Sequence, residues 1–392
     1  MRWPSRLFAC ILWRWDPRLP HTHSAEAPLN PRRVIRYGPC VPVIALVMTS
    51  CDVLGLGEDC TSNAAPVFTH MFTDLTQVRS IVPLGTPSSG GEIKERHQVQ
   101  VRTETDAAGT TRGRNVPIVA AARARLQSVR RYQAASPPAP YADEYYGFVL
   151  EFSCEVTARF DHIRTAGAKL AEATGAAFTS TFHDPRNSVT FEAGEVIGHT
   201  DGTPPAMRGE DRSFAFDYAL YNSKHENPFL NSNRYRQTRN LRNSLHAICG
   251  GSYYTGSLRS AFDAALGYYG QSAGGNCRSA SRDVAGSLAG GWFRAGAAEE
   301  SSGWRLAFAT EYDGAVRLAI HPSTAFFFTP VLTSGSVNRD PAQATGTSPY
   351  CYTDRTTEFY FQLSADGRMS MAQRPGTCSG SAPTTYTVQW ER

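Results

Sequence analysis

The strongest constraint on the fold is a run of alternating residue types near the middle of the chain. From Phe148 to Phe160 every second side chain is apolar or cysteine, and most of the side chains between them are polar. Successive side chains of a β-strand point to opposite faces, so this pattern predicts one long strand with a buried face and a polar face. The same period continues to His162, which we expect to point inward with the apolar side chains.

Turn signals extend the β prediction over much of the chain. Three short β-prone runs are separated by Gly, Ser and Thr clusters: residues 81–85, 97–101 and 116–121. Asp313-Gly314 and Asp366-Gly367 each lie between two β-prone runs, which predicts antiparallel hairpins. Two segments are expected to be helical instead: residues 166–176 are a short helix candidate, and residues 258–269 have helical spacing. We therefore expect a mainly β protein with short helices.

Composition describes an ordinary globular chain. Of 392 residues, 41% are hydrophobic and 19% are charged, which is enough apolar material for two domains of common size. The formal net charge is +4, and much of this excess comes from arginines before residue 40. The remainder is nearly neutral, so the chain lacks the basic footprint that is typical of a nucleic-acid-binding protein.

The first 51 residues predict export. Three arginines between residues 32 and 36 precede an apolar run at 41–48, and small residues then lead to Cys51. This layout is typical of an export signal and resembles a bacterial lipoprotein signal with Cys51 as the lipidated residue, although Met48 stands where that pattern prefers Leu. The apolar run is shorter than the roughly 20 residues of a membrane-spanning helix. The alternative interpretation of this run is a buried strand.

The segments on either side of this signal do not predict folded structure. Residues 1–31 mix Trp, Arg and Pro without a helical or strand period, and we interpret them as a misassigned gene start with true initiation near Val34. Residues 1–51 are thus a misassigned start plus a lipoprotein-type signal. Residues 52–75 are small, polar and turn-rich, which predicts a linker to a folded domain. We expect a periplasmic or cell-surface protein held at a membrane through Cys51.

Cysteine usage agrees with an oxidising compartment. Of nine cysteines, six remain once Cys51 and the two cysteines before it are set aside, and an even number is compatible with disulfides. No C-x-x-C zinc or redox motif is present. Local pairs that each bracket one segment are the preferred disulfides: Cys249 with Cys277, and Cys351 with Cys378. Cys60 and Cys154 are left either paired or free.

Three short pieces between residues 158 and 221 follow one another in an informative order: ARFDHI, FEAGEVIGHTDG and FAFDYALY. In the second piece Gly194, Gly198 and Gly202 permit the tight turns that the corners of a small β-barrel need. This ordered triplet resembles the second half of lysostaphin/LytM-type zinc endopeptidases of peptidoglycan. Biotinyl, lipoyl and sugar-transport hybrid-motif domains carry similar glycine turns.

The resemblance covers roughly residues 76–238 and implies a duplicated hybrid-motif domain, built as a β-barrel or sandwich. Beyond it, residues 239–392 predict a second, mostly β domain with a short helix and disulfides. The expected architecture is therefore a hybrid-motif β domain followed by a second, mostly β domain.

The resemblance also implies where a zinc site would lie. Members of this family hold one zinc through a His and an Asp four residues apart in an early strand and the second His of a late His-x-His pair. Three protein ligands leave the fourth zinc position open for an activated water, which His162 would assist by resemblance. Here the late pair falls on Ala215 and Asp217, and the early region offers only His97. A complete family zinc site is therefore not present.

Two interpretations of these residues stay open. In the first, His97, His162 and Asp217 are a residual metal site of two histidines and one carboxylate, with His97 and Asp217 as the proposed ligands. In the second, Asp217 is a hydrogen-bonded carboxylate, His162 a satisfied inward histidine and His97 an exposed strand residue. We expect the latter, and hence a non-catalytic envelope lipoprotein that binds peptidoglycan or an envelope protein and needs no cofactor. The alternative is an active zinc metallo-endopeptidase of the cell wall with an altered ligand set.

A competing motif predicts different chemistry. Residues 270–274 fit G-x-S-x-G, the nucleophile elbow of serine esterases, with Ser272 as nucleophile and Asp283 and His321 following in the appropriate order. An elbow requires a buried strand before the serine and a helix after it, whereas Ser272 follows a helical pattern and enters Ser/Gly-rich chain. The serine esterase is thus a minor alternative, and a glycine-rich loop is the simpler interpretation.

Overall fold

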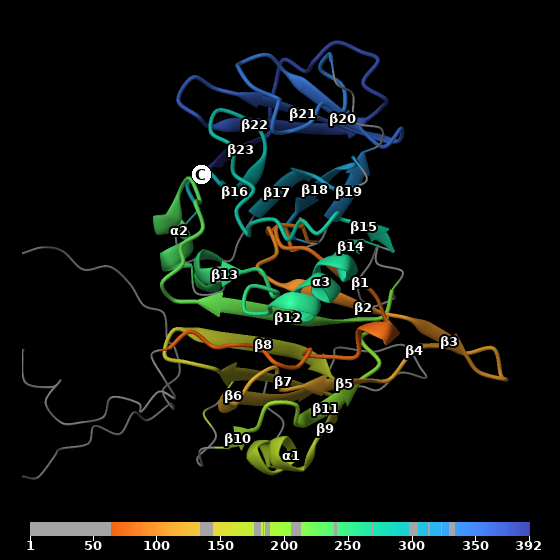
Figure 1. The fold of residues 1–392 in the computed structure, drawn as a ribbon. Coiled ribbons are helices and arrows are strands. Elements are labelled where there is room, and N and C mark those ends of the chain that lie inside the picture. The colour runs from red at the N-terminus through yellow and green to blue at the C-terminus, as the bar shows by residue number, and fades with distance from the viewer. Residues whose placement is uncertain are drawn as a thin grey trace, which may run out of the picture. The chain divides into compact units, whose positions relative to one another are not determined.

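This computed structural model describes the chain from residue 64 to residue 392 (Figure 1). Inside that range it leaves out residues 89, 134–143, 176–181, 183, 185–188, 205–212, 239–240, 269, 298–304, 313, 323 and 329–333. The expected signal, Cys51 and Cys60 therefore lie outside the described residues. Strands dominate the described chain, which confirms the mainly β prediction.

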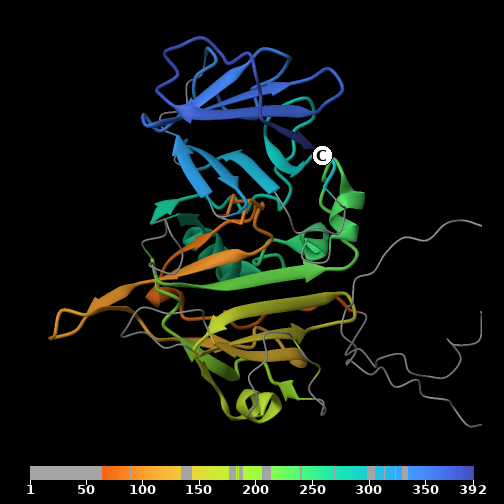
Figure 2. The ribbon, with the colours of Figure 1, turned by 180° about the vertical axis from the view of Figure 1, so that it is seen from behind.

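The first large sheet is antiparallel throughout and has the strand order β1-β2-β12-β8-β7-β6-β10, with β13 added beside β12. Its strands are β1 (Val78–Val82), β2 (His97–Val101), β6 (Ala124–Gln133), β7 (Glu144–Glu151), β8 (Val156–Ile163), β10 (Thr190–Phe191), β12 (Ala215–Asn222) and β13 (Ala247–Ile248). In Figure 2 the green β12 and the yellow β8 run side by side, as their pairing requires. Its strand β8 contains the piece ARFDHI, and β12 contains most of the piece FAFDYALY.

One face of this sheet is the apolar core of the first part of the molecule. Phe148, Phe160, Phe216 and Tyr218 are all fully buried there. The helix α3 (Gly256–Ala265) contributes the buried Phe262 to the same cluster. Aromatic rings of this size bury large areas, so this cluster is a main source of stability for the sheet.

Smaller elements complete this part of the chain. A three-stranded sheet contains β5 (Val116–Val119), β11 (Val196–Thr200) and β9 (Thr165–Ala166), in that order. A two-stranded hairpin pairs β3 (Thr103–Thr105) with β4 (Thr111–Gly113). The 3-10 helix η1 (Leu75–Gln77) precedes β1, and the short helix α1 (Ala168–Thr174) lies inside the helical segment expected from spacing.

The long alternating run is a hairpin and not the single strand that its period predicts. Residues 144–151 form β7 and residues 156–163 form β8, and the two strands pair with each other. The turn between them is closed by bonds from the Phe152 and Ser153 amides to the Val156 carbonyl and from the Val156 amide to Ser153. The turn has four residues, an even number, so apolar and polar residues still alternate in phase on both sides of it. The turn also contains no Gly or Pro, so nothing in the sequence indicates where the chain reverses.

In the glycine-rich piece only two of the three glycines expected at turns have the backbone conformation of a tight turn. Gly194 and Gly202 have φ angles of 84° and 76°, as a tight turn requires. Gly198 instead lies within β11, where an added Cβ would come 2.5 Å from the Thr165 carbonyl oxygen. The flanking strands β10 and β11 pair with β6 and β5 respectively, so they enter different sheets.

The second large sheet is formed by residues 290–391 and is also antiparallel, in the order β19-β18-β17-β16-β23-β22-β21-β20. Its strands are β16 (Gly290–Arg294), β17 (Arg305–Thr310), β18 (Val316–Ile320), β19 (Thr324–Phe328), β20 (Tyr350–Thr353), β21 (Thr357–Leu363), β22 (Met369–Pro375) and β23 (Val388–Glu391). The pairs β17–β18 and β21–β22 confirm the two hairpins predicted from Asp-Gly turns. Trp292 and Trp390 are buried in the core of this sheet.

Residues 223–289 connect the two sheets through α2 (Ser232–Gln237), the 3-10 helix η3 (Arg242–His246) and the hairpin of β14 (Gly267–Tyr268) and β15 (Gln271–Ser272). Tyr235 of α2 packs between Phe229 and Phe293, and Arg305 of the second sheet forms an ion pair with Glu92 at 3.2 Å. Contacts of this kind place all described residues in one compact unit. No helix in the described residues is both long and apolar enough to cross a membrane.

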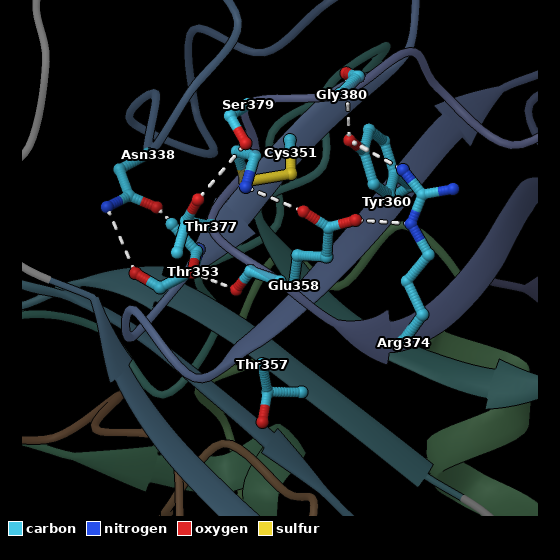
Figure 3. Close-up of a disulfide and its surroundings, with 12 residues drawn as sticks. Asn338, Cys351, Thr353, Thr357, Glu358, Tyr360, Arg374, Thr377, Ser379 and Gly380 are labelled. Atoms are coloured by element: carbon cyan, nitrogen blue, oxygen red, sulfur yellow. Dashed lines mark hydrogen bonds and ion pairs between the residues drawn. A yellow bond between two sulfur atoms is a disulfide. The ribbon is translucent and has the colours of Figure 1, made fainter.

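Disulfides fasten both parts. Cys249 pairs with Cys277 and Cys351 pairs with Cys378, which are the two pairs expected from the sequence. Cys154 is disulfide-bonded as well. Figure 3 shows Cys351 beside Glu358 and Arg374 on the second sheet.

Candidate functional site

His97 lies on the apolar face of the first sheet and is completely buried. Its Nδ1 lies 2.9 Å from the Val82 carbonyl oxygen, and its Nε2 accepts a hydrogen bond from the Gly250 amide at 2.9 Å. Burial lowers the pKa of His97 to about 4, against a smaller opposite effect of the bond to Val82. His97 is therefore a neutral core histidine, and the expectation of an exposed strand residue is wrong.

Asp217 lies on the opposite face of the same sheet. Strand pairing places Asp217 opposite Gln98 and Tyr218 opposite His97, and neighbouring residues of a strand point to opposite faces. The Asp217 carboxylate accepts a bond from Nε of Arg96 at 2.9 Å. The structure therefore does not bring His97 and Asp217 together as a residual metal site.

His162 also points away from the core, contrary to the expectation from its alternation. The pairing of β7 with β8 shifts between Tyr146 and Phe148, so Asp161 and His162 together face Gly147 in a β-bulge. His162 has a φ of 65°, in the left-handed region. Its Nδ1 lies 3.0 Å from the Tyr132 hydroxyl and its Nε2 lies 3.7 Å from Asp217. The bulge thus moves the ring to the charged face.

Asp161 is the centre of that charged face. Its buried carboxylate accepts bonds from Nη2 of Arg130 at 2.5 Å, Nη2 of Arg159 at 2.7 Å and the Tyr132 hydroxyl at 2.7 Å. Burial alone would raise the pKa of this carboxyl, but the positive charges of His162, Arg130 and Arg159, with the Tyr132 bond, lower it to about 2. Asp161 is consequently ionised at neutral pH.

Gly147 makes room for this ionic cluster. A Cβ at this position would lie 2.8 Å from Nε of Arg130 and 2.9 Å from Oδ1 of Asp161. The Phe182 ring lies against both arginines, with its centroid 4.6 Å from the Arg130 guanidinium and 5.0 Å from that of Arg159. An aromatic ring over two guanidinium groups adds cation–π attraction and excludes water from one side of the cluster.

A cleft of about 330 Å³ borders the charged face. Its lining comes from β6, β7, β8, β12 and the η3 segment, and the polar side chains among it include Gln127, Thr157, Arg159, Tyr221, Asn243 and His246. The Tyr221 hydroxyl and Nε of Arg159 are buried, and among the described residues neither has a hydrogen-bond partner. Buried donors are normally satisfied, and both of these residues line the cleft, so a ligand that reached the two donors would supply the missing acceptors.

The residues of the serine esterase alternative do not form a catalytic set in the described chain. Ser272 is exposed on the two-residue strand β15, and its hydroxyl accepts a bond from the Gly274 amide at 3.1 Å. Both Asp283 oxygens accept backbone amides, from Leu230 and Gly291. No hydrogen bond joins Ser272, Asp283 and His321 within the part of the chain that the structure describes.

Two groups of side chains have ligand atoms close enough to hold a metal ion: His97 with Cys249 and Cys277, and Glu358 with Cys351 and Cys378. In both groups the cysteines are joined as a disulfide. Disulfide sulfurs are poor metal ligands compared with thiolates, so neither group is a metal site in this oxidation state.

Sequence reasoning missed the strand that supplies half of the charged face. Residues 124–133 form β6, with Arg125, Arg130 and Tyr132 on the polar side. Its pairing register shifts between Leu126 and Ser128, which interrupts the period-two signal. If the period-two pattern is allowed one inserted residue between Leu126 and Val129, both become inward positions and the sequence predicts the strand.

Comparison of this chain with known protein families, with curated proteins and with solved structures yields no match.

Proposed function

We propose that this chain is an exported bacterial envelope lipoprotein that binds peptidoglycan without cleaving it. In this proposal residues 76–238 are a degenerate lysostaphin-type hybrid-motif domain, and the ligand occupies the cleft beside Arg159 and Tyr221. The signal-like layout before Cys51 and the disulfides support export, since disulfides persist in oxidising compartments.

The observation that carries the binding role is the pair of unsatisfied buried donors at the cleft. The Tyr221 hydroxyl and Nε of Arg159 each lose hydration on burial without gaining a protein acceptor in the described chain. Leaving a buried donor unpaired costs about 1–3 kcal/mol, which a ligand with carbonyl, hydroxyl or carboxylate oxygens would recover. Peptidoglycan is rich in all three kinds of oxygen.

The residues available for catalysis support binding over hydrolysis. His97 has both ring nitrogens bonded to the backbone, and Asp217 is paired with Arg96. A zinc hydrolase needs neutral imidazoles or carboxylates that converge on one point with an open fourth position. The proposed activity therefore requires no zinc.

The proposal is tested by incubating the purified full chain with isolated peptidoglycan sacculi and measuring retention and released muropeptides. We expect retention without release, and loss of retention in Ser223→Trp, because Ser223 is an exposed residue at the cleft and an indole there would fill it. Ser379→Trp, on an exposed turn of the second part, is the matched control and should bind normally. Metal-dependent muropeptide release would overturn the non-catalytic role, and equal retention of both variants would exclude this cleft.

A further inference from the structure

A histidine and two cysteines on the core side of the first sheet form a group that the binding proposal does not use. Their ligand atoms, Nε2 of His97 and Sγ of Cys249 and Cys277, all lie within 4.8 Å of one another. His97 starts β2, Cys249 follows β13 directly, and Cys277 lies beyond β15. The group therefore joins three segments that are far apart in the sequence.

The hydrogen bonds of His97 fix which nitrogen can act as a ligand. The Val82 carbonyl oxygen can only accept, so Nδ1 carries the proton and Nε2 has the lone pair. This lone pair lies 3.8 Å from the Cys277 sulfur. Metal-ligating histidines usually donate their other ring N–H to a carbonyl or carboxylate, which is the arrangement that Val82 supplies.

The spacing suits a tetrahedral ion once the cysteines are reduced. With zinc–sulfur bonds of about 2.3 Å and zinc–nitrogen bonds of about 2.1 Å, tetrahedral geometry places nitrogen and sulfur roughly 3.6 Å apart. The observed distance from Nε2 to the Cys277 sulfur is 3.8 Å. After reduction the two sulfurs need to move to about 3.8 Å from each other, and both cysteines are only half-buried, which leaves room for that movement.

We infer that the reduced form of this chain binds one Zn²⁺ or a similar borderline-soft divalent ion through Nε2 of His97 and the thiolates of Cys249 and Cys277. A dithiol reductant breaks the sulfur–sulfur bond, leaves two thiols on the protein and is itself oxidised to a disulfide. Metal binding then forms two metal–sulfur bonds and releases the two thiol protons, and a metal–nitrogen bond at Nε2 of His97 replaces the hydrogen bond from the Gly250 amide. Oxidation by a disulfide reverses the exchange and expels the ion.

The second disulfide provides an internal contrast, shown in Figure 3. Its neighbouring carboxylate, Glu358, is already occupied: one oxygen forms an ion pair with Arg374, and the other accepts the Cys378 amide at 2.6 Å. An entering cation would have to displace a guanidinium from this carboxylate. Cys351 and Cys378 therefore supply a matched control, with two thiols after reduction but no available third ligand among the described residues.

The test is a titration of the full chain with Co²⁺ after reduction by a dithiol under argon. We expect one equivalent to produce visible d–d bands of a tetrahedral site and thiolate-to-cobalt charge transfer in the near ultraviolet. The Cys351→Ser/Cys378→Ser variant should give the same spectrum, and Cys249→Ser/Cys277→Ser should give none. The oxidised chain should leave the cobalt spectrum unchanged.

His97→Gln separates coordination from folding, because its amide keeps a donor for Val82 and an acceptor for Gly250. We expect His97→Gln to weaken Co²⁺ binding more than about 100-fold. Loss of a group that only hydrogen-bonds a metal ligand weakens affinity about 10–100-fold, so a larger effect indicates loss of a ligand. A second readout is thermal unfolding, in which Zn²⁺ should raise the Tm of the reduced wild type and leave that of Cys249→Ser/Cys277→Ser unchanged. A reduced wild type without cobalt bands, or equal bands in the Cys249→Ser/Cys277→Ser variant, would overturn the inference. Neither result depends on peptidoglycan binding.

Discussion

On one face of the first sheet His97 is held neutral among aromatic rings, whereas on the other face Asp161 is held ionised among arginines. Tyr218 and Phe262 pack near the His97 ring, with centroids 6.1 Å and 5.7 Å away. Arg130 and Arg159 both bond Asp161. Two buried polar groups in one sheet thus have pKa values displaced downward for different reasons, namely desolvation of a cation for His97 and ion pairing for Asp161.

This difference between the two faces shows which of them can contact a bound ligand. On the core face both nitrogens of His97 are bonded to the backbone, and no solvent reaches the ring. On the charged face Arg159 belongs both to the Asp161 cluster and to the cleft lining. A ligand in the cleft would therefore contact a guanidinium whose position Asp161 already fixes, which is the preorganisation that tight binding needs.

The largest expected effect is on the charged face, in Asp161→Asn. The substitution removes the negative charge that Arg130 and Arg159 share, and breaking such a buried ionic cluster costs about 3 kcal/mol in the free energy of unfolding. Urea unfolding at neutral pH measures it. Asp366→Asn, on an exposed turn of the second sheet, should change the same quantity by less than about 0.5 kcal/mol. Equal midpoints for the two variants would show that the Asp161 cluster is not a stabilising unit.

The pH dependence of stability distinguishes the two faces. The pKa of His97 is about 4 in the folded chain and near 6.5 when unfolded, so the unfolded state binds the proton first as pH falls. Stability from His97 is complete above pH 6.5 and falls by about 3 kcal/mol as the pH drops to 4. Asp161, with a folded pKa of about 2, contributes stability that is lost only as the pH falls from roughly 4 to 2.

Urea midpoints of wild type and His97→Gln across this pH range measure the separation. The variant should lose the step between pH 6.5 and 4 and keep the more acidic one. His225→Gln, which replaces an exposed histidine, should retain both steps. A His97→Gln profile that matches the wild type would mean that another group titrates in this window.

Gly147→Ala should give a smaller effect, confined to the charged face. The new methyl group would overlap Nε of Arg130 and Oδ1 of Asp161, and overpacking of this kind costs about 1–3 kcal/mol. Differential scanning calorimetry measures the loss as a lower Tm. Gly380→Ala serves as the control, because the nearest atom to its added Cβ is 3.6 Å away. Equal Tm values for the two alanine variants would show that the side chains of the cluster accommodate the added methyl group without loss of stability.

Much of the fold follows from the sequence, because alternation and turn residues are local signals. The Asp-Gly hairpins of the second sheet and both disulfide pairs with short separations were predictable for this reason. The face of the sheet on which an individual side chain lies was less predictable. One inserted residue at the bulge of β8 turns His162 to the opposite face, and one register shift in β6 conceals the strand that carries Arg130.

The candidate site was harder still to predict, since it is assembled from separate parts of the chain. Gln127, Arg159, Tyr221 and Asn243 come from four segments that meet only through the order of the sheet and the η3 turn. Nothing in the local pattern around Tyr221 marks its hydroxyl as unpaired. That property depends on the packing of the surrounding strands, which a single sequence does not specify.

Tyr221→Phe is expected to cause the smallest loss of stability and is the most direct test of the binding account. Removal of a buried hydroxyl that has no partner in the described chain breaks no hydrogen bond and relieves the cost of an unpaired donor, so the free energy of unfolding should stay unchanged or rise by up to about 3 kcal/mol. If the hydroxyl donates to a ligand, the same change should weaken retention on peptidoglycan sacculi about tenfold, as loss of one hydrogen bond to a ligand does. Tyr350→Phe, on the second sheet, should bind as the wild type does. Weakened retention without any loss of stability is the predicted result, and Tyr221→Phe retained as strongly as the wild type would contradict the assignment of this cleft as the binding site.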